Sequence, residues 1–350
     1  MKKKVITGIE LTLLILSMLT FNTRSANSLF MTRTPNYEAH HEQEGTSQEE
    51  QLSMVYVLEN NDPDYKNPPF EDTLTIIDPS THTITKNISR FNFAETVGGH
   101  RRIAANDGGQ SVVVGEEIPR RLLKYDAVGN LLFNTSIGEQ ILAVDISEEN
   151  YIYAVNYKTI YGEKVFIFDS NGTLLKEELY GGFDIVVDDY SDSVWLVGAD
   201  IKKLSKNLTL EFSIDPIAWC AVSVDFTSKG EVWVAERYYS GTWWGRLLRI
   251  SPDGNITKTI ELNSSPFCLS VNRNDDSFWV ASGVSDGGLY KYNDDGQMVL
   301  QVESANRWSV KVNQTDGSVW VAGFGDVKHY SANGDLISSI AGFSSSQAYV

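Results

Sequence analysis

Cysteine, histidine and positive charge are scarce in this 350-residue chain, and each shortage narrows the range of functions. Two cysteines are too few for a scaffold held together by disulfides. With 29 basic and 46 acidic residues, the net charge of −17 argues against a nucleic-acid backbone or an anionic membrane surface as partner. It favours a soluble protein, or one that meets cations. HExxH, a phosphate-binding loop and Ser-His-Asp spacing are also missing, so no catalytic motif assigns a reaction.

The N-terminal segment 1–28 has the composition of an export signal. Lys2–Lys4 precede an apolar run over Leu11–Phe21, and Ala26–Ser28 form a small-x-small cleavage site. Cleavage would remove four basic residues and one acidic residue, which makes the mature charge −20. We therefore expect a secreted, periplasmic or cell-surface protein with no membrane span in the mature chain. An uncleaved N-terminal anchor is the rival interpretation.

A polar stretch and then a repeated unit follow this segment. Residues 29–51 are polar and have no period, which predicts a disordered acidic linker. From residue 52 onwards a unit repeats, and its clearest copy is Asp316–Ile340, where three alternating runs surround Trp320 and the turn Ser331–Gly334. The residues at the position of Trp320 are Tyr56, Val113, Tyr153, Trp195, Trp233, Trp279 and Trp320.

These seven marker residues recur at the interval that is typical of radial sheet repeats. A period of about 40 residues with about four short strands per unit is the signature of propellers. The runs alternate with period 2 and are rich in Val, Ile, Tyr and Trp, which disfavours helical repeats of similar length. The sequence therefore predicts an all-β protein, a seven-bladed β-propeller of four-stranded antiparallel blades over residues 52–350.

The unit around Trp233 predicts the four strands of a blade. They are expected at Trp219–Asp225, Glu231–Ala235, Arg246–Ile250 and Ile256–Glu261. No run before Tyr56 reads as the first strand of the first unit. The C-terminal residues Ser346–Val350 resemble the start of such a strand, so we expect them to complete the first blade and close the ring. A chain cut short in an eighth unit is the alternative.

The repeat also resembles known propeller groups. The pattern xVWVA, a turn and G-x-L/I, seen around Trp233 and Trp320, resembles the NHL and virginiamycin B lyase-like propellers. The first unit, Met54–Ile88, is similar to the YVTN repeat of surface-layer-type propellers. The resemblance spans Met54–Val350. Because members of these groups include binding platforms, lyases and lactonases, it implies the fold and leaves the function open.

The most unusual stretch is Arg237–Arg246, which we expect to be an inserted loop between the second and third strands of its blade. In a propeller such loops share one face with the connections between blades, at the mouth of the central channel. We expect a binding platform there for sugar rings or for the apolar side chains of a partner. Its predicted residues are Arg237, Tyr238, Tyr239, Trp243 and Trp244, with Trp219 and Trp308 from neighbouring strands. Capping of the blade ends is the other interpretation of these aromatics.

A second set of candidates lies at the ends of the second strands. Glu59, Glu116, Asn156 and Glu236 occupy one repeat position, so four oxygen ligands could surround the channel mouth. Lactonase-type propellers hold a divalent cation with a comparable set, and oxygen ligands suit calcium or magnesium. Solvated carboxylates at strand ends are the alternative interpretation.

Acid–base chemistry has few candidates. His100 and Arg307 precede or begin first strands, where Arg307 could polarise a carboxylate while His100 moves a proton, as a lyase requires. Virginiamycin B lyase-like enzymes use His and Glu near the channel, but His100 stands alone here. Cys220 and Cys268 occupy neighbouring units in registers that differ by one residue, which favours two thiols over a bridge.

The aromatic residues outnumber the paired catalytic ones, and this decides the main hypothesis. We expect an exported, non-catalytic propeller that binds an extracellular protein or polysaccharide, and the sequence assigns no certain cofactor, with Ca or Mg as the candidates. The alternative is a lyase or lactonase that depends on Ca²⁺ or Mg²⁺, and a structural role in a cell-surface layer comes third. The ligand and the oligomeric state do not follow from the sequence.

Overall fold

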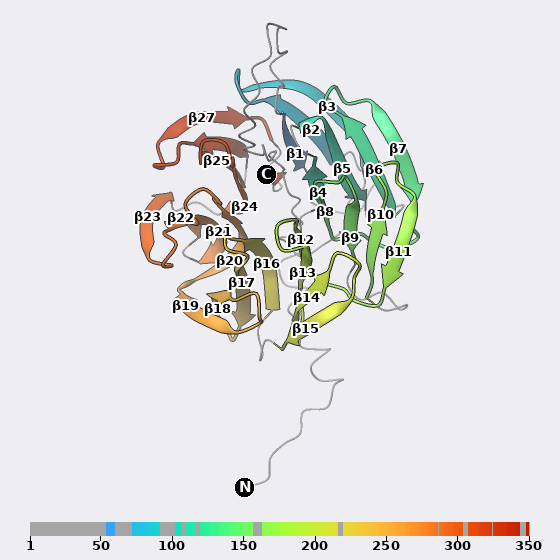
Figure 1. The fold of residues 1–350 in the computed structure, drawn as a ribbon. Coiled ribbons are helices and arrows are strands. Elements are labelled where there is room, and N and C mark those ends of the chain that lie inside the picture. Colours follow the sequence, from blue (N-terminus) through green and yellow to red (C-terminus); the bar gives the residue numbers. More distant parts are fainter. Residues whose placement is uncertain are drawn as a thin grey trace, which may run out of the picture.

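Seven four-stranded antiparallel sheets form a ring in the computed structural model of the protein (Figure 1). This confirms the predicted seven-bladed propeller. No helix long and apolar enough to cross a membrane occurs among the described residues. The structure describes residues 54–59, 72–91, 102–106, 109–116, 120–156, 163–215, 220–285, 287–303, 307–323, 325–343 and 348–349.

Six blades have their strands in chain order from the centre of the ring to its rim, and we call these positions A to D. Blade 2 contains β4 (Ile103–Ala105), β5 (Ser111–Glu116), β6 (Arg121–Asp126) and β7 (Leu131–Ser136). Blade 3 contains β8 (Ala143–Ile146), β9 (Ile152–Val155), β10 (Val165–Phe168) and β11 (Leu174–Glu178). Blade 4 contains β12 (Asp184–Asp188), β13 (Ser193–Val197), β14 (Ile201–Ser205) and β15 (Leu210–Ile214).

The next three blades follow the same order. Blade 5 contains β16 (Cys220–Phe226), β17 (Val232–Tyr239), β18 (Trp243–Ile250) and β19 (Ile256–Leu262). Blade 6 contains β20 (Ser264–Val271), β21 (Phe278–Ser285), β22 (Gly288–Tyr292) and β23 (Met298–Glu303). Blade 7 contains β24 (Arg307–Val312), β25 (Val319–Gly323), β26 (Asp326–Tyr330) and β27 (Leu336–Ala341).

Blade 1 takes its strands from both ends of the described chain. Its strands B, C and D are β1 (Val55–Glu59), β2 (Asp72–Asp78) and β3 (Thr83–Phe91), and strand A is β28 (Ala348–Tyr349). β28 pairs antiparallel with β1, with Leu58 opposite Tyr349 and Glu59 opposite Ala348. The strand that follows blade 7 in the chain thus belongs to the sheet of blade 1.

The marker residues lie on strand B of each blade and are buried between blades. Trp195, Trp233, Trp279 and Trp320 are among the largest fully buried side chains of the described residues. An indole buries more apolar area than other side chains, so each of these residues contributes a large share of the packing between blades. The repeat pattern thus predicted these strands, and both of their faces are buried.

Polar side chains join the innermost strands. Strand A has one edge that is not paired within its own sheet, and side chains of the preceding blade meet its N–H groups. Asp145 Oδ2 accepts a hydrogen bond from the N–H of Val187 at 2.8 Å, and Asp184 Oδ2 accepts one from Val224 at 3.1 Å. Because a buried backbone N–H without a partner is costly, these acceptors stabilise the contact of each blade with the next.

Cationic side chains join the blades farther from the axis. In four blades the strand-C residue opposite the marker is Lys or Arg, and it donates a hydrogen bond to a backbone carbonyl in the C–D turn of the next blade. These contacts are Lys124 to Ser170 at 3.2 Å, Lys203 to Pro252 at 3.1 Å, Arg249 to Asp294 at 3.0 Å and Lys291 to Ala332 at 2.9 Å. Each donor thus fixes the C–D turn of the following blade.

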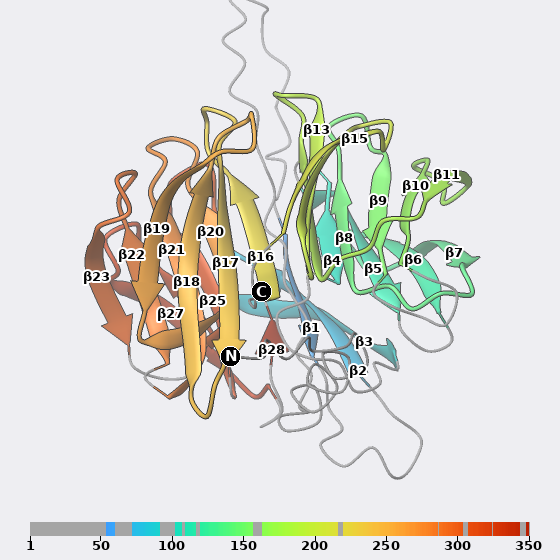
Figure 2. The same ribbon diagram turned by 90° about the horizontal axis from the view of Figure 1, so that it is seen from below.

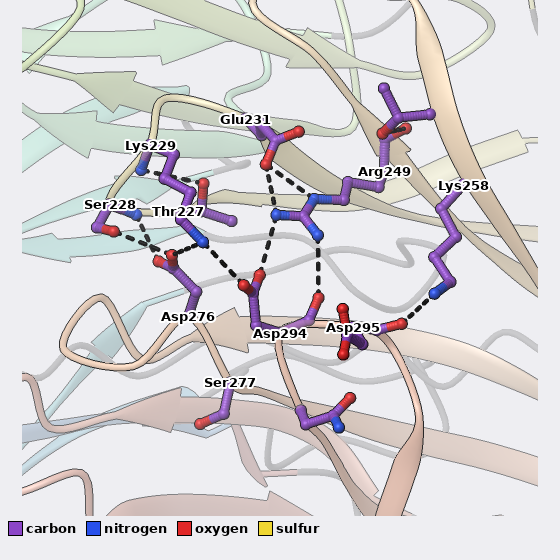
Figure 3. A network of polar contacts seen from close by, with 12 residues as sticks. Thr227, Ser228, Lys229, Glu231, Arg249, Lys258, Asp276, Ser277, Asp294 and Asp295 are labelled. Atoms are coloured by element: carbon purple, nitrogen blue, oxygen red, sulfur yellow. Dashed lines mark hydrogen bonds and ion pairs between the residues drawn. The ribbon is translucent and has the colours of Figure 1, made fainter.

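Figure 3 shows the junction between blades 5 and 6, where more charges gather around this contact. Arg249 also forms ion pairs with Glu231 and Asp294, and Lys229 lies 3.1 Å from Asp276 and 2.8 Å from Asp294. Opposite charges therefore alternate across this junction, which holds the A–B turn of blade 5 against blade 6.

Candidate functional site

The candidate site lies at the end of the propeller where strands B and C are connected, at the bottom of Figure 2. There β17 and β18 form one long hairpin. Our expectation of an inserted loop at Arg237–Arg246 was wrong in this respect. The two strands stay paired up to Tyr239 and Trp243, and only residues 240–242 form the turn.

The physical reason for the longer hairpin is visible in its residues. Tyr238 pairs with Trp244, and Tyr239 pairs with Trp243. Aromatic cross-strand pairs stabilise antiparallel strands, and Gly241 supplies the positive φ of 92° that the three-residue turn requires. Two pairs of adjacent aromatics favour strands on either side of the turn, and this signal was overlooked in the sequence.

The alternation of the strands divides the four aromatics between the two faces of the hairpin tip. Tyr239 and Trp243 share one face, with their ring centroids 5.0 Å apart. Tyr238 and Trp244 are directly paired and therefore share the other face. Trp244 is 45% exposed and Tyr239 is 40% exposed, whereas Tyr238 and Trp243 are partly buried. The tip thus presents one well-exposed aromatic ring on each side.

Arg237 packs the hairpin against blade 6. Its guanidinium lies 5.6 Å from the ring centroid of Trp243 and 5.0 Å from that of Phe267 in β20. Phe267 in turn packs edge-on against Trp308 of β24 at 4.3 Å. Arg237, Phe267 and Trp308 are buried. Arg237 and Trp308 therefore support the tip from beneath, and Trp219 lies outside the described residues.

Arg307 is held within blade 7. It lies opposite Gly323 on strand B and forms an ion pair with Asp326 at the start of strand C. Gly323 has no side chain, which leaves room for Arg307 to reach across strand B. Asp326 was not identified from the sequence as the partner of Arg307. The available signal was an acidic residue three positions after Gly323, the glycine that ends strand B. His100, the other catalytic candidate, lies outside the described residues.

Two of the four candidate metal ligands are neutralised by arginines of their own blade. Glu116 forms an ion pair with Arg121, and Glu236 forms one with Arg246. In both cases the partners face each other across strands B and C. Burial raises the pKa of Glu236, while the Arg246 charge acts in the opposite direction.

The other two candidate ligands are engaged as well. The amide oxygen of Asn156 accepts a hydrogen bond from the Lys164 N–H at 2.5 Å, and Glu59 is buried. Within the described part of the chain no group of three or more His, Cys, Asp or Glu is arranged to hold a metal. Carboxylates that already carry arginine partners do not fit a shared hard cation.

The two cysteines are both free thiols. Cys220 packs at the edge of the core between blades 5 and 6, and Cys268 belongs to the core between blades 6 and 7. Burial raises the pKa of the Cys220 thiol to about 11. At neutral pH the thiol is therefore protonated and a poor nucleophile.

No protein-family model and no curated protein matches the chain. Solved structures resemble it at low identity. A hydrazine synthase structure from Kuenenia stuttgartiensis has a TM-score of 0.60 and 10% identity, covering 77% of this chain and 89% of its own. A functionally unknown protein from Desulfotomaculum acetoxidans DSM 771 has a TM-score of 0.62 and 12% identity, covering 83% and 97%.

BamB from Moraxella catarrhalis has a TM-score of 0.50 and 17% identity, covering 78% of this chain and 85% of its own. At such identities the likeness shows the fold alone. These structures support a β-propeller, while the narrower NHL, YVTN or virginiamycin B lyase-like grouping stays a prediction.

Proposed function

We propose that the protein is a non-catalytic binding propeller that holds an exported protein partner at the tip of the β17–β18 hairpin. The observation that carries this proposal is the exposure of Trp244 and Tyr239 at a tip held in place by cross-strand pairs and by Arg237. Large exposed rings on a rigid support have the properties of binding hot spots, because little conformational entropy is lost when a partner covers them.

The arrangement favours a protein over a polysaccharide. A sugar platform needs several rings side by side on one surface, whereas the hairpin divides its rings between two faces. Phe267 and Trp308, which would extend such a platform, are buried. A projecting hairpin with an aromatic ring on either side instead suits insertion between two surfaces of a folded partner.

The charged side chains at this end of the propeller support a binding role over a reaction. Arg307, Glu116 and Glu236 are each engaged by an opposite charge of the same blade. A group that acts on a substrate has to exchange such a partner first, and the buried member of each pair would lose its counter-charge on doing so.

Site-specific photo-crosslinking tests the proposal. A benzophenone amino acid is placed at Tyr239 or Trp244 and, as a matched control, at Tyr190, which is 85% exposed in the A–B turn of blade 4 at the opposite end. We expect one defined protein adduct from the two hairpin positions and none from Tyr190, with the Tyr239 adduct lost in the Trp244→Ala protein. Equal labelling at all three positions would refute the proposal. Retention on a polysaccharide column that depends on Trp244 would replace the protein partner by a glycan.

The export that this function requires is also a proposal, and it rests on segment 1–28. Mass spectrometry of the protein from its own host should find a mature chain that begins at about residue 29. A full-length chain in the membrane fraction would instead support the N-terminal anchor.

A further inference from the structure

The junction between blade 7 and blade 1, which we call the closing seam, differs from other junctions in the residue that crosses it. At the position where Lys203, Arg249 and Lys291 reach the next blade, blade 7 carries His329. Its Nδ1 atom lies 3.0 Å from Nε2 of His82 in the C–D turn of blade 1. Two titratable rings thus take the place of a permanent charge.

Both rings pack around Trp320. His329 stacks on the indole at a centroid distance of 4.4 Å and an angle of 8°, and His82 lies 5.7 Å from it. His329 is buried, and its Nε2 atom lies 2.9 Å from the hydroxyl of Ser318. His82 has a φ of 56°, the left-handed conformation that glycine adopts in C–D turns such as that of Gly296. The turn therefore fixes the position of the His82 ring.

Protonation removes the hydrogen bond between the rings. While both rings are neutral, one N–H lies between Nε2 of His82 and Nδ1 of His329 and forms the hydrogen bond between the rings. The other nitrogen of His329, Nε2, has the hydroxyl of Ser318 as its partner. When both rings are charged, all four ring nitrogens carry protons. Two N–H groups then face each other with no acceptor between them, and like charges repel at this separation. The contact therefore breaks at the second protonation.

The acidic groups near the two histidines do little to stabilise the doubly protonated pair. The charge of Asp316 favours protonation of His329, but burial and the neighbouring His82 oppose it. Asp78 lies in the same turn as His82, and its carboxylate already accepts hydrogen bonds from the N–H and hydroxyl of Ser80. Two protonated rings are therefore not compensated by a dedicated carboxylate on either blade.

The rest of the closing seam is thin. Within the sheet of blade 1, the C-terminal strand β28 is tied to β1 through two pairs among the described residues, Leu58–Tyr349 and Glu59–Ala348. The apolar cluster that links the blades here contains seven buried members among the described residues, Val55, Val57, Ile77, Trp320, Ala322, Val327 and Phe343. The cluster between blades 4 and 5 contains eleven. With fewer apolar side chains in the described cluster, loss of the ring contact has a larger relative effect at this junction.

We propose that the His82–His329 contact is an acid-sensitive latch, which holds blade 7 against blade 1 at neutral pH and loosens the closing seam as the pH falls. The ring of blades then opens at this seam before it opens elsewhere. The four junctions that are crossed by Lys124, Lys203, Arg249 and Lys291 keep these contacts, because the side chains stay charged throughout this range.

The direction of the pH effect follows from the buried ring. Burial lowers the pKa of His329 from 6.5 to about 4. The folded state thus binds protons less readily than the opened state, so the contribution of the contact is complete above about pH 6.5 and is lost progressively as the pH falls towards 4.

Hydrogen exchange of the full chain at about pH 7.5 and about pH 5 tests the latch, because opening exposes backbone N–H groups. β13 of blade 4 serves as reference in the same sample and removes the intrinsic pH dependence of exchange. We expect the protection of β1 and β26, relative to β13, to fall on the order of tenfold at the lower pH. An unchanged ratio would overturn the proposal.

Two variants separate the latch from other acid effects. His329→Lys supplies the cation that four other junctions have at this position, and His82→Asn suits the left-handed turn while it removes one titratable ring. We expect the relative protection to become independent of pH in His329→Lys, and to keep only part of its pH dependence in His82→Asn, because the buried His329 ring still titrates there. A pH response equal to that of the wild type in either variant would refute the role of the pair. If His329→Lys does not fold, His82→Asn decides alone.

Discussion

Oδ2 of Asp225 in blade 5 accepts a hydrogen bond from the N–H of Val271 in blade 6 at 3.0 Å. Both residues lie on strand A, and both are buried. The same carboxylate accepts the N–H of Phe226 through Oδ1 at 3.0 Å and the hydroxyl of Ser270 at 3.3 Å. One side chain thus satisfies backbone donors of two blades, in a place that water does not reach.

Replacement of this carboxylate should destabilise the whole ring. Asp225→Ala removes a buried acceptor from the N–H groups of Val271 and Phe226, and we expect a loss of about 2–4 kcal/mol in the free energy of unfolding. Urea denaturation measures the change. Asp253→Ala, in the exposed C–D turn of the same blade, is the control and should change it by less than about 0.5 kcal/mol. Equal effects of the two substitutions would show that the carboxylate is not needed for the contact.

The contrast between Trp233 and Asp225 shows what could be predicted from sequence. The blade count and the B strands follow from the repeated local pattern of β-forming residues around the markers. Asp225 lies in the same pattern, but its partner is 46 residues away. The pairing of innermost strands depends on how the blades are stacked, which no local pattern encodes.

The site was predictable to a lesser degree for the same reason. The aromatic content of 237–246 marked the hairpin, whereas its register divided the rings between two faces. The ion pairs Glu116–Arg121 and Glu236–Arg246 are cross-strand contacts, so they required the B–C register that the sequence leaves open. His82 and His329 are 247 residues apart and meet only because the ring closes.

Removal of residues 348–350 should weaken the first blade selectively. It takes away β28, the partner of Leu58 and Glu59, and leaves the inner edge of β1 without its neighbour. We expect a lower thermal midpoint and faster hydrogen exchange in β1, while β13 of blade 4 keeps its protection. Uniform loss of protection in both strands would show that the ring unfolds as one cooperative unit.

Cys220 should react slowly with alkylating agents in the native protein. Its pKa of about 11 leaves a thiolate fraction at about pH 8 that is roughly 100-fold below that of a cysteine with the ordinary value. Mass spectrometry of protein treated with iodoacetamide measures the rate, and the same protein in denaturant gives the reference. A native rate close to the denatured one would mean that the thiol is activated, which would reopen the case for a reaction at this end of the propeller.

Arg237 should control the order of the hairpin tip more than the stability of the propeller. Its guanidinium packs against Trp243 and Phe267, and two such cation–π contacts are worth about 1–2 kcal/mol together. Arg237→Ala should therefore speed hydrogen exchange in residues 238–244, with only a small shift of the thermal midpoint. Arg237→Lys keeps the charge but lacks the planar group that stacks on both rings. Its exchange rate at the tip should therefore lie between those of the wild type and of Arg237→Ala. If exchange at the tip is unchanged in Arg237→Ala, the aromatic pairs alone hold the hairpin, and the binding proposal would rest on Tyr239 and Trp244 without support from blade 6.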